Sequence, residues 1–202
     1  LFDGGGSTKY LVSEIDDVPS SGAHFFAGTS ANDVITTSPA DPSSATGYLG
    51  DDQITGSSGT DYLGGNEGDD ILSGGAGDDV LIGGSGDDTL DGGDGDDEIF
   101  GGAGDDTLYS SLGADIEDGG EGIDTYIIRE TLSYVPVINL KLETAYLQGS
   151  VPDYSNSVAN MENVKMLGDS AKSISGSDDD NTLNGGAGDD TLDGGDGNDT
   201  LR

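Results

Sequence analysis

A nine-residue repeat that runs without a gap over residues 47–127 constrains the fold of this chain more than any other feature. Each of its nine units has Gly at position four and Asp at position six. Position eight is apolar in eight of the units and is Glu117 in the remaining one. Repetition at a fixed period predicts a solenoid, because a unit that cannot bury its apolar face alone must stack on its neighbours.

Shorter runs of the same repeat lie on either side of this block. Three units occupy residues 176–202, and the first of them has Asn181 in place of Asp at position six. A degenerate unit at residues 28–36 carries Asp33 and Ile35 in register. Both runs are therefore expected to join the same solenoid.

We divide the chain into four segments. Residues 1–46 form an N-terminal cap that contains the degenerate unit, and residues 47–127 form the main repeat block. Residues 128–175 form a non-repeat insert with longer strands that continues the roll, and residues 176–202 form the second repeat block. Composition supports these boundaries, since the main block has a net charge of −22 and the insert a net charge of −1.

Each unit is expected to consist of a tight turn and a very short strand. The first six residues are too rich in Gly for a regular interior, because Gly costs roughly 0.5–1 kcal/mol in a helix or strand. The remaining residues form a strand with the position-eight side chain inward, so two units make one coil and stacked coils give two facing parallel sheets. One Leu or Ile per unit contributes about 2–3 kcal/mol, whereas ordering nine residues costs on the order of 10 kcal/mol or more. The core alone is therefore too small to stabilise the fold.

The charge of the chain excludes several classes of protein. There are 41 acidic and 6 basic residues, a net charge of −35, and this field would repel the phosphates of a nucleic acid. No Cys is present for disulfide or thiolate chemistry. No run approaches the length of a membrane span. The sequence opens at Leu1 and shows no signal-peptide pattern, so we expect it to be a piece of something longer.

The sequence pattern of the insert differs from that of the repeats. Ile138, Leu140 and Leu142 alternate with polar residues, which predicts a half-buried strand. We expect longer strands in this segment and a surface loop over residues 148–160. His24 has no fixed Ser or Cys partner and is not expected to be catalytic.

Four tyrosines are open to two interpretations. They either pack inside the wider coil of the insert or line a sugar-binding face. These residues are Tyr126, Tyr134, Tyr146 and Tyr154.

Three units carry the repeat in its most regular form. Residues 74–82, 83–91 and 101–109 read GGAGDDVLI, GGSGDDTLD and GGAGDDTLY. They resemble the RTX (repeats-in-toxin) family, whose calcium-binding nonapeptide is G-G-x-G-x-D-x-U-x. The resemblance implies an all-β fold, a right-handed parallel β-roll, or β-helix, with Ca²⁺ ions stacked between its turns. It also implies that turn groups at positions one, three and five serve one ion, and those at positions two, four and six the next.

The chemistry of the acids agrees with that cation. Units 18 residues apart stack on one edge, which places Asp70 over Asp52 and Asp88 over Asp70. Carboxylates together with loop carbonyls make an all-oxygen site, and Ca²⁺ takes 6–8 hard oxygen ligands. Zinc, copper and iron prefer His or Cys, of which the chain offers only His24. An alternative, that the acids are only a solvated surface, does not explain why Gly and Asp recur in phase.

The expected sites follow from pairing each unit with the second one after it. Pairs from Asp52 to Asp124 and a further pair with Asp33 lead to an expectation of about 7–9 ions. Ala114 and Ile123 depart from the frequent Asp at position five. The predicted metal ligands are Asp33, Asp51, Asp52, Gly59, Asp61, Gly68, Asp69, Asp70, Gly74, Gly75, Gly77, Asp78, Asp79, Gly83, Gly84, Gly86, Asp87, Asp88, Gly92, Gly93, Gly95, Asp96, Asp97, Gly101, Gly102, Gly104, Asp105, Asp106, Asp115, Asp124, Gly185, Gly186, Gly188, Asp189, Asp190, Gly194, Gly195, Gly197 and Asp199.

The resemblance implies a calcium-binding β-roll module of a bacterial protein exported by type I secretion. Such a module stays extended at low cytosolic calcium and folds outside the cell, because a ligand that binds only the folded state stabilises it. No catalytic constellation is expected in the chain: spacing alone does not exclude carboxylate pairs suited to glycoside hydrolysis, but every acid has a simpler role as a calcium ligand. Two alternatives remain: an adhesin module that binds polysaccharide or a cell surface, and the C-terminal appendage of a secreted epimerase, protease or hydrolase.

Overall fold

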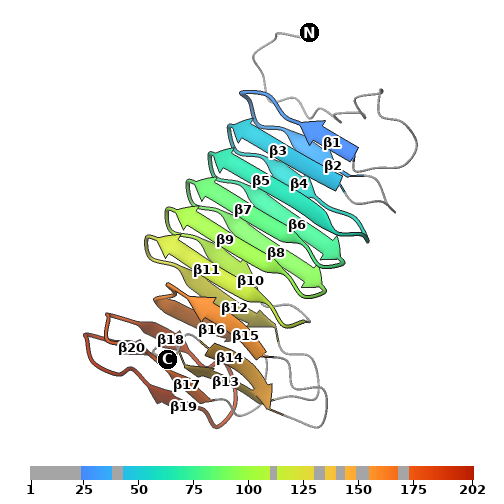
Figure 1. The fold of residues 1–202 in the computed structure, drawn as a ribbon. Coiled ribbons are helices and arrows are strands. Elements are labelled where there is room, and N and C mark those ends of the chain that lie inside the picture. Colours follow the sequence, from blue (N-terminus) through green and yellow to red (C-terminus); the bar gives the residue numbers. More distant parts are fainter. Residues whose placement is uncertain are drawn as a thin grey trace.

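The computed structural model describes residues 24–37, 43–109, 113–129, 135–139, 144–148, 155–167 and 173–202. Every regular element in these ranges is a β-strand. Within the same ranges no helix is long and apolar enough to cross a bilayer. Outside the insert, successive strands alternate between two sheets, and the strands of each sheet stack along one axis, so the described part of the chain is an all-β solenoid (Figure 1).

The first sheet collects the odd-numbered strands and one even-numbered strand of the insert. Its strands are parallel in the repeat blocks, as in β5 beside β7 and β7 beside β9. In spatial order they are β1 (His24–Ala27), β3 (Ser43–Leu49), β5 (Asp61–Glu67), β7 (Val80–Ser85), β9 (Glu98–Ala103), β11 (Ile116–Glu121), β15 (Ser155–Ala159), β14 (Thr144–Gln148), β13 (Val135–Asn139), β17 (Ser173–Ser175) and β19 (Thr191–Asp193).

The second sheet collects the remaining even-numbered strands, and all of its printed pairings are parallel. Neighbouring strands in the main block are offset by 18 residues, as in Leu72 beside Leu90, which confirms the two-unit coil. In spatial order the strands are β2 (Val34–Thr36), β4 (Gln53–Thr55), β6 (Ile71–Ala76), β8 (Thr89–Asp94), β10 (Thr107–Tyr109), β12 (Thr125–Arg129), β16 (Asn163–Leu167), β18 (Thr182–Asn184) and β20 (Thr200–Leu201).

The core is a thin stack of position-eight side chains between the two sheets. Glu117 takes the same inward position, lies beside Ile99 and Val158 and is buried. Tyr126 is also in this stack, which supports packing over sugar binding for that tyrosine. The buried stack comprises Ile35, Ile54, Leu63, Leu72, Leu81, Leu90, Ile99, Leu108, Tyr126, Val164, Ile174 and Leu183.

The strands are longer than the repeat predicts. Strand β7 covers the last three residues of one unit and continues through Gly83, Gly84 and Ser85 of the next. The continuation is possible because Gly84 lies in register beside Gly102 of the neighbouring coil. The expectation that Gly excludes these residues from strands was wrong, since pairing between coils overrides the intrinsic cost of Gly.

The insert departs from the parallel pattern. Strand β14 pairs antiparallel with both β13 and β15. Residues 155–159, expected in a surface loop, form β15, so that expectation was wrong for them. Without a Gly-rich turn every nine residues, the segment makes reversals instead of coils. The first sheet therefore has two additional strands, β13 and β14, between β15 and β17. In the second sheet the strands of the same coils, β16 and β18, are direct neighbours.

Several expectations fall on residues that the structure does not describe. Tyr134 and Tyr154 lie outside the described ranges, as do Leu140 and Leu142 of the expected strand. Strand β13 ends before them, at Asn139. The backbones of His24 and Tyr146 belong to strands, and their side chains lie outside the description.

Candidate metal centre

The position-six carboxylates form a row along each edge of the roll. In the main block they are buried, because each lies at the start of a strand or directly before it and reaches under the preceding coil. Asp70 Oδ1 accepts a hydrogen bond from the backbone N–H of Asp52 at 2.7 Å, and Asp88 Oδ1 accepts one from Asp70 at 2.7 Å. The other edge repeats this contact, since Asp79 Oδ1 accepts from the Asp61 N–H at 2.8 Å. The predicted stacking of these acids is confirmed.

The second oxygen of most position-six carboxylates is buried and has no hydrogen-bond partner. Burying a charged oxygen without compensation is costly, so these atoms need a positive partner or a proton. A hard cation that accepts oxygen ligands fits this requirement. The atoms are Oδ2 of Asp52, Asp70, Asp79, Asp88, Asp97, Asp106 and Asp124.

Glycine at position one leaves space beside these oxygens. A Cβ added to Gly83 would collide with two acceptors, Oδ2 of Asp88 and the carbonyl oxygen of Gly101. The corresponding space beside Gly92 is bordered by Asp97 Oδ2. A side chain at these positions would fill a space lined by oxygen atoms, and the residues present therefore fit a calcium ion.

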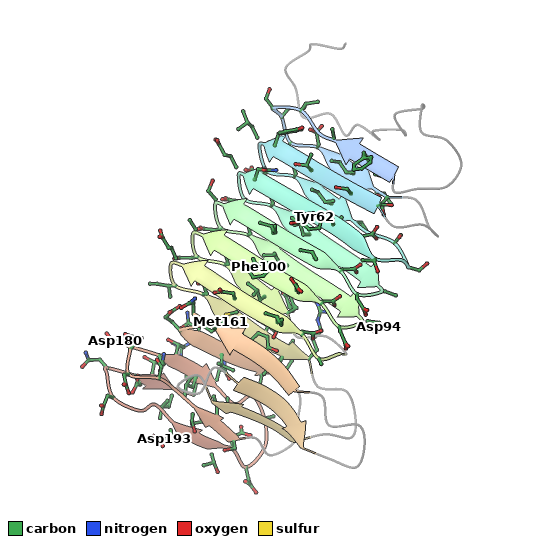
Figure 2. The ribbon with its side chains drawn as sticks, viewed as in Figure 1. Tyr62, Asp94, Phe100, Met161, Asp180 and Asp193 are labelled. Atoms are coloured by element: carbon green, nitrogen blue, oxygen red, sulfur yellow. The ribbon has the colours of Figure 1, made fainter. Side chains whose placement is uncertain are left out.

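The position-five carboxylates are exposed and reach the opposite way along the axis. Asp69 Oδ1 accepts from the Asp87 N–H at 3.0 Å, and Asp87 Oδ1 accepts from the Asp105 N–H at 2.9 Å. Asp78 and Asp96 do the same on the other edge. A turn with Asp at both positions, such as that of Asp87 and Asp88, therefore has one acid directed at the following coil and one directed at the preceding coil. Figure 2 shows side chains that end in oxygen atoms along the edges of the roll.

The turn positions that direct oxygen atoms into the same space between coils differ from those that the resemblance implied. Between the turns of residues 65–73 and 83–91, the carbonyls of Asn66 and Gly68 point forward, toward Gly84 and Gly86. The Asp69 carboxylate points forward with them. Oxygen atoms from positions two, four and five therefore face the same gap, the space between two stacked turns.

Positions one, three and six of the following turn face the same gap. The carbonyl of Gly83 points back toward Gly65, the carbonyl of Ser85 accepts from the Gly68 N–H at 2.9 Å, and Asp88 reaches back to Asp70. The expected pairing of position five with positions one and three was therefore wrong. Alternation along the turn is interrupted at position four, where Gly86 has a φ of +127°.

No three His, Cys, Asp or Glu side chains converge on one point within the described ranges. A cation in a gap would therefore be held by one or two carboxylates and by backbone carbonyls. Which of the predicted residues bind a metal stays a prediction.

Burial changes the acidity of the inward carboxyl groups. It raises the pKa of Asp88 to about 7, although the hydrogen bond from the Asp70 N–H opposes the shift. The pKa of Asp97 rises to about 7 and that of Asp79 to about 6, again mainly through burial. The negative charges of neighbouring acids add to each shift. Without a cation, Asp88 and Asp97 in the folded chain therefore take up protons near pH 7, and Asp79 takes up its proton near pH 6.

A pH dependence of folding without calcium follows. The folded pKa values of about 6–7 lie above the ordinary value of 3.8, so the folded state binds protons more tightly than the unfolded state. Stability should be present below the ordinary value and be lost as the pH rises through the folded pKa values. In excess chelator, we expect the β-sheet circular dichroism signal to increase as the pH falls from about 8 to about 5. A chelated chain whose spectrum is the same across this range would contradict the prediction.

The second repeat block is more open than the first. Asp199 Oδ1 accepts from the Asn181 N–H at 3.0 Å, so the stacking continues. Asp190 and Asp199 are half-buried, whereas Asp115 of the main block is 1 % exposed. Asp189 at position five is exposed. The structure thus places the predicted metal ligands of the second repeat block in its turns, but their carboxylates are less buried than those of the main block.

The sequence interpretation missed Glu162. Its Oε2 accepts the N–H of Asp124 at 2.8 Å, as Asp124 Oδ1 accepts that of Asp106 at 2.8 Å. Its carbonyl accepts from Asn181 Nδ2 at 3.1 Å. Glu162 therefore takes the position-six place in the coil between the two blocks, 38 residues after Asp124. The available signal is Glu-Asn-Val at residues 162–164, which matches Asp-x-apolar in the repeat.

Comparison with known proteins adds a family assignment. The model of the RTX calcium-binding nonapeptide repeat matches the chain in four copies, at residues 44–72, 64–99, 91–126 and 173–201. These matches cover more than half of the chain and both repeat blocks. A search of curated proteins finds no match.

Proposed function

This chain belongs to the RTX calcium-binding nonapeptide repeat family, and we propose that its β-roll folds outside the cell when calcium binds between the turns. The observation that carries the proposal is the row of buried, unpartnered carboxylate oxygens at position six. The family itself is a structural calcium-binding module. What the proposal adds is the identity of the ligands, the place of folding and the use of folding as a switch.

The chain's own residues explain why folding would depend on the ion. Asp70 and Asp88 are joined only through a backbone N–H, and each keeps one oxygen that no group neutralises. Bound calcium would supply the positive charge that these oxygens lack. Without it, position-six and position-five acids repel one another along the same gap, and the small core does not compensate.

Export is the context that this switch suits. In the low calcium of the cytosol, repulsion between the acids would keep the chain extended and able to pass through a type I secretion system. In millimolar calcium outside, the turns would close and the β-roll would support the protein to which it belongs.

The proposal is tested by calorimetric titration of the chain with CaCl₂ and, as the matched control, with MgCl₂. We expect several Ca²⁺ ions to bind per chain and Mg²⁺ to bind far more weakly, because Mg²⁺ demands a stricter octahedral geometry and gives up its water reluctantly. An absence of calcium binding at millimolar concentration would refute the proposal, and so would equal affinity for the two ions.

A further inference from the structure

Position two of the turn has two backbone forms in this chain. In one form φ is positive, as at Gly84 with +124°, and also at the non-glycine residues Tyr48 with 82° and Asn66 with 85°. In the other form the residue is Ser or Thr and φ is not positive. Within the described ranges this second form occurs at Thr29, Ser57 and Ser177.

The second form closes the turn with its own hydrogen bonds. The Ser57 N–H donates to Asp61 Oδ2 at 2.6 Å, and the Ser57 hydroxyl donates to the same oxygen at 3.0 Å. Thr29 makes the same two contacts to Asp33 Oδ2, at 2.6 and 2.9 Å. In both turns the inward carboxylate oxygen therefore has two donors from the same turn.

The turn at Ser177 follows the same geometry with a neutral acceptor. The Ser177 N–H donates to Asn181 Oδ1 at 2.7 Å, and its hydroxyl lies 3.3 Å from that oxygen. Asn181 carries no negative charge that a cation would have to neutralise. This turn also opens the second repeat block.

In the main block, turns with positive φ at position two lack these donors. Asn66 precedes Asp70 as Ser57 precedes Asp61, yet Asp70 Oδ2 is buried without a partner. Tyr48 and Asp52 show the same relationship. In the main block, whether Oδ2 has a donor from its own turn thus follows the sign of φ at position two, and it does so even where that residue is not glycine.

We infer that Thr29, Ser57 and Ser177 make turns that close without calcium, while turns with positive φ at position two require it. A backbone N–H and a hydroxyl present partial positive charge to the oxygen that a cation would otherwise contact, and hydrogen bonds to a carboxylate are roughly twice as strong as neutral ones. The inference rests on the proposed function. It removes Asp61 from the calcium-bound set, although the repeat spacing includes it, whereas Asp33 keeps its Oδ1 buried and without a partner.

The turns that close by themselves lie at or near the start of the repeat runs. Thr29 lies in the unit before the main block, Ser57 lies near its start and Ser177 opens the second block. On one edge of the main block the calcium-dependent turns therefore follow the turn of Thr29, and on the other edge they follow the turn of Ser57.

Two substitutions test the inference in opposite directions. Ser57→Gly removes the hydroxyl and permits positive φ, so it should add one calcium ion per chain. Asn66→Ser introduces a residue that rarely adopts positive φ, so its turn should take the self-closed form and one ion should be lost. The readout is the number of ions bound at saturation by equilibrium dialysis, with circular dichroism in millimolar calcium to confirm that each variant is folded.

Ser57→Ala is the matched control, because it removes the hydroxyl but keeps a residue that disfavours positive φ. It should bind the same number of ions as the parent chain, and Thr29→Gly repeats the gain at a second turn if Ser57→Gly does not fold. Unchanged stoichiometry in Asn66→Ser and in the folded glycine variant would overturn the inference. A parent chain that binds no calcium would instead refute the proposed function, so the two failures are distinguishable.

Discussion

Chelation of calcium is expected to unfold both repeat blocks of this chain at neutral pH. Each site that binds only the folded state contributes about 2.7 kcal/mol when calcium is present at about 100 times its dissociation constant. The net stability of an ordinary domain is about 5–15 kcal/mol. Losing several such contributions therefore removes more stabilising free energy than the thin core can supply.

The measurement is far-UV circular dichroism with amide hydrogen exchange, in millimolar calcium and after excess chelator. We expect the β-sheet signal to be replaced by that of a coil, and slow exchange at Asp52, Asp70 and Asp88 to disappear. Adding calcium back should restore both, while adding magnesium should not. A chelated chain at neutral pH that keeps its β spectrum and its protected amides would contradict the prediction.

The second large effect is expected from Gly86→Ala. Gly86 has a φ of +127°, which L residues rarely adopt, and a Cβ there would collide with the carbonyl oxygen of Gly68 on the preceding coil. Strain of this kind costs about 1–3 kcal/mol, and displacing a packed neighbour costs a similar amount. We therefore expect a loss of about 2–6 kcal/mol in the free energy of unfolding measured with urea in saturating calcium.

Gly64→Ala is the matched control for this substitution. Gly64 lies in β5 without a positive φ, and a Cβ there would meet only the Asn66 side chain, at 3.8 Å. Its free energy of unfolding should change by less than about 1 kcal/mol, because Ala fits a strand at least as well as Gly does. Equal losses in the two variants would show that the close approach of Gly86 to Gly68 does not limit stability.

The regular part of the fold follows from the sequence because its causes are local. Gly at position four permits the turn, the apolar residue at position eight must point inward, and Asp at position six precedes each strand. An 18-residue coil and the stacking of Asp70 on Asp52 follow from these requirements. The family resemblance adds calcium to this description, and the buried oxygens of the structure agree with it.

The insert could not be predicted in the same way. Its antiparallel strands and the place of Glu162 depend on which coil lies beside them, and residues 124 and 162 are 38 positions apart. The nine-residue spacing does not connect such residues. Only the stacking of β12 on β16 brings Glu162 against Asp124.

The sequence alone determined the period, the inward residues and the rows of acids, because each is set within a single nine-residue unit. Only the tertiary structure decided which groups share a gap and which carboxylate oxygens lack a partner. Those properties depend on the direction of each carbonyl toward a neighbouring coil. The partner of the carboxylate oxygen changes with the sign of φ at a single turn residue: the Ser57 N–H donates to Asp61, whereas Asp70, which follows Asn66, keeps an oxygen without a partner.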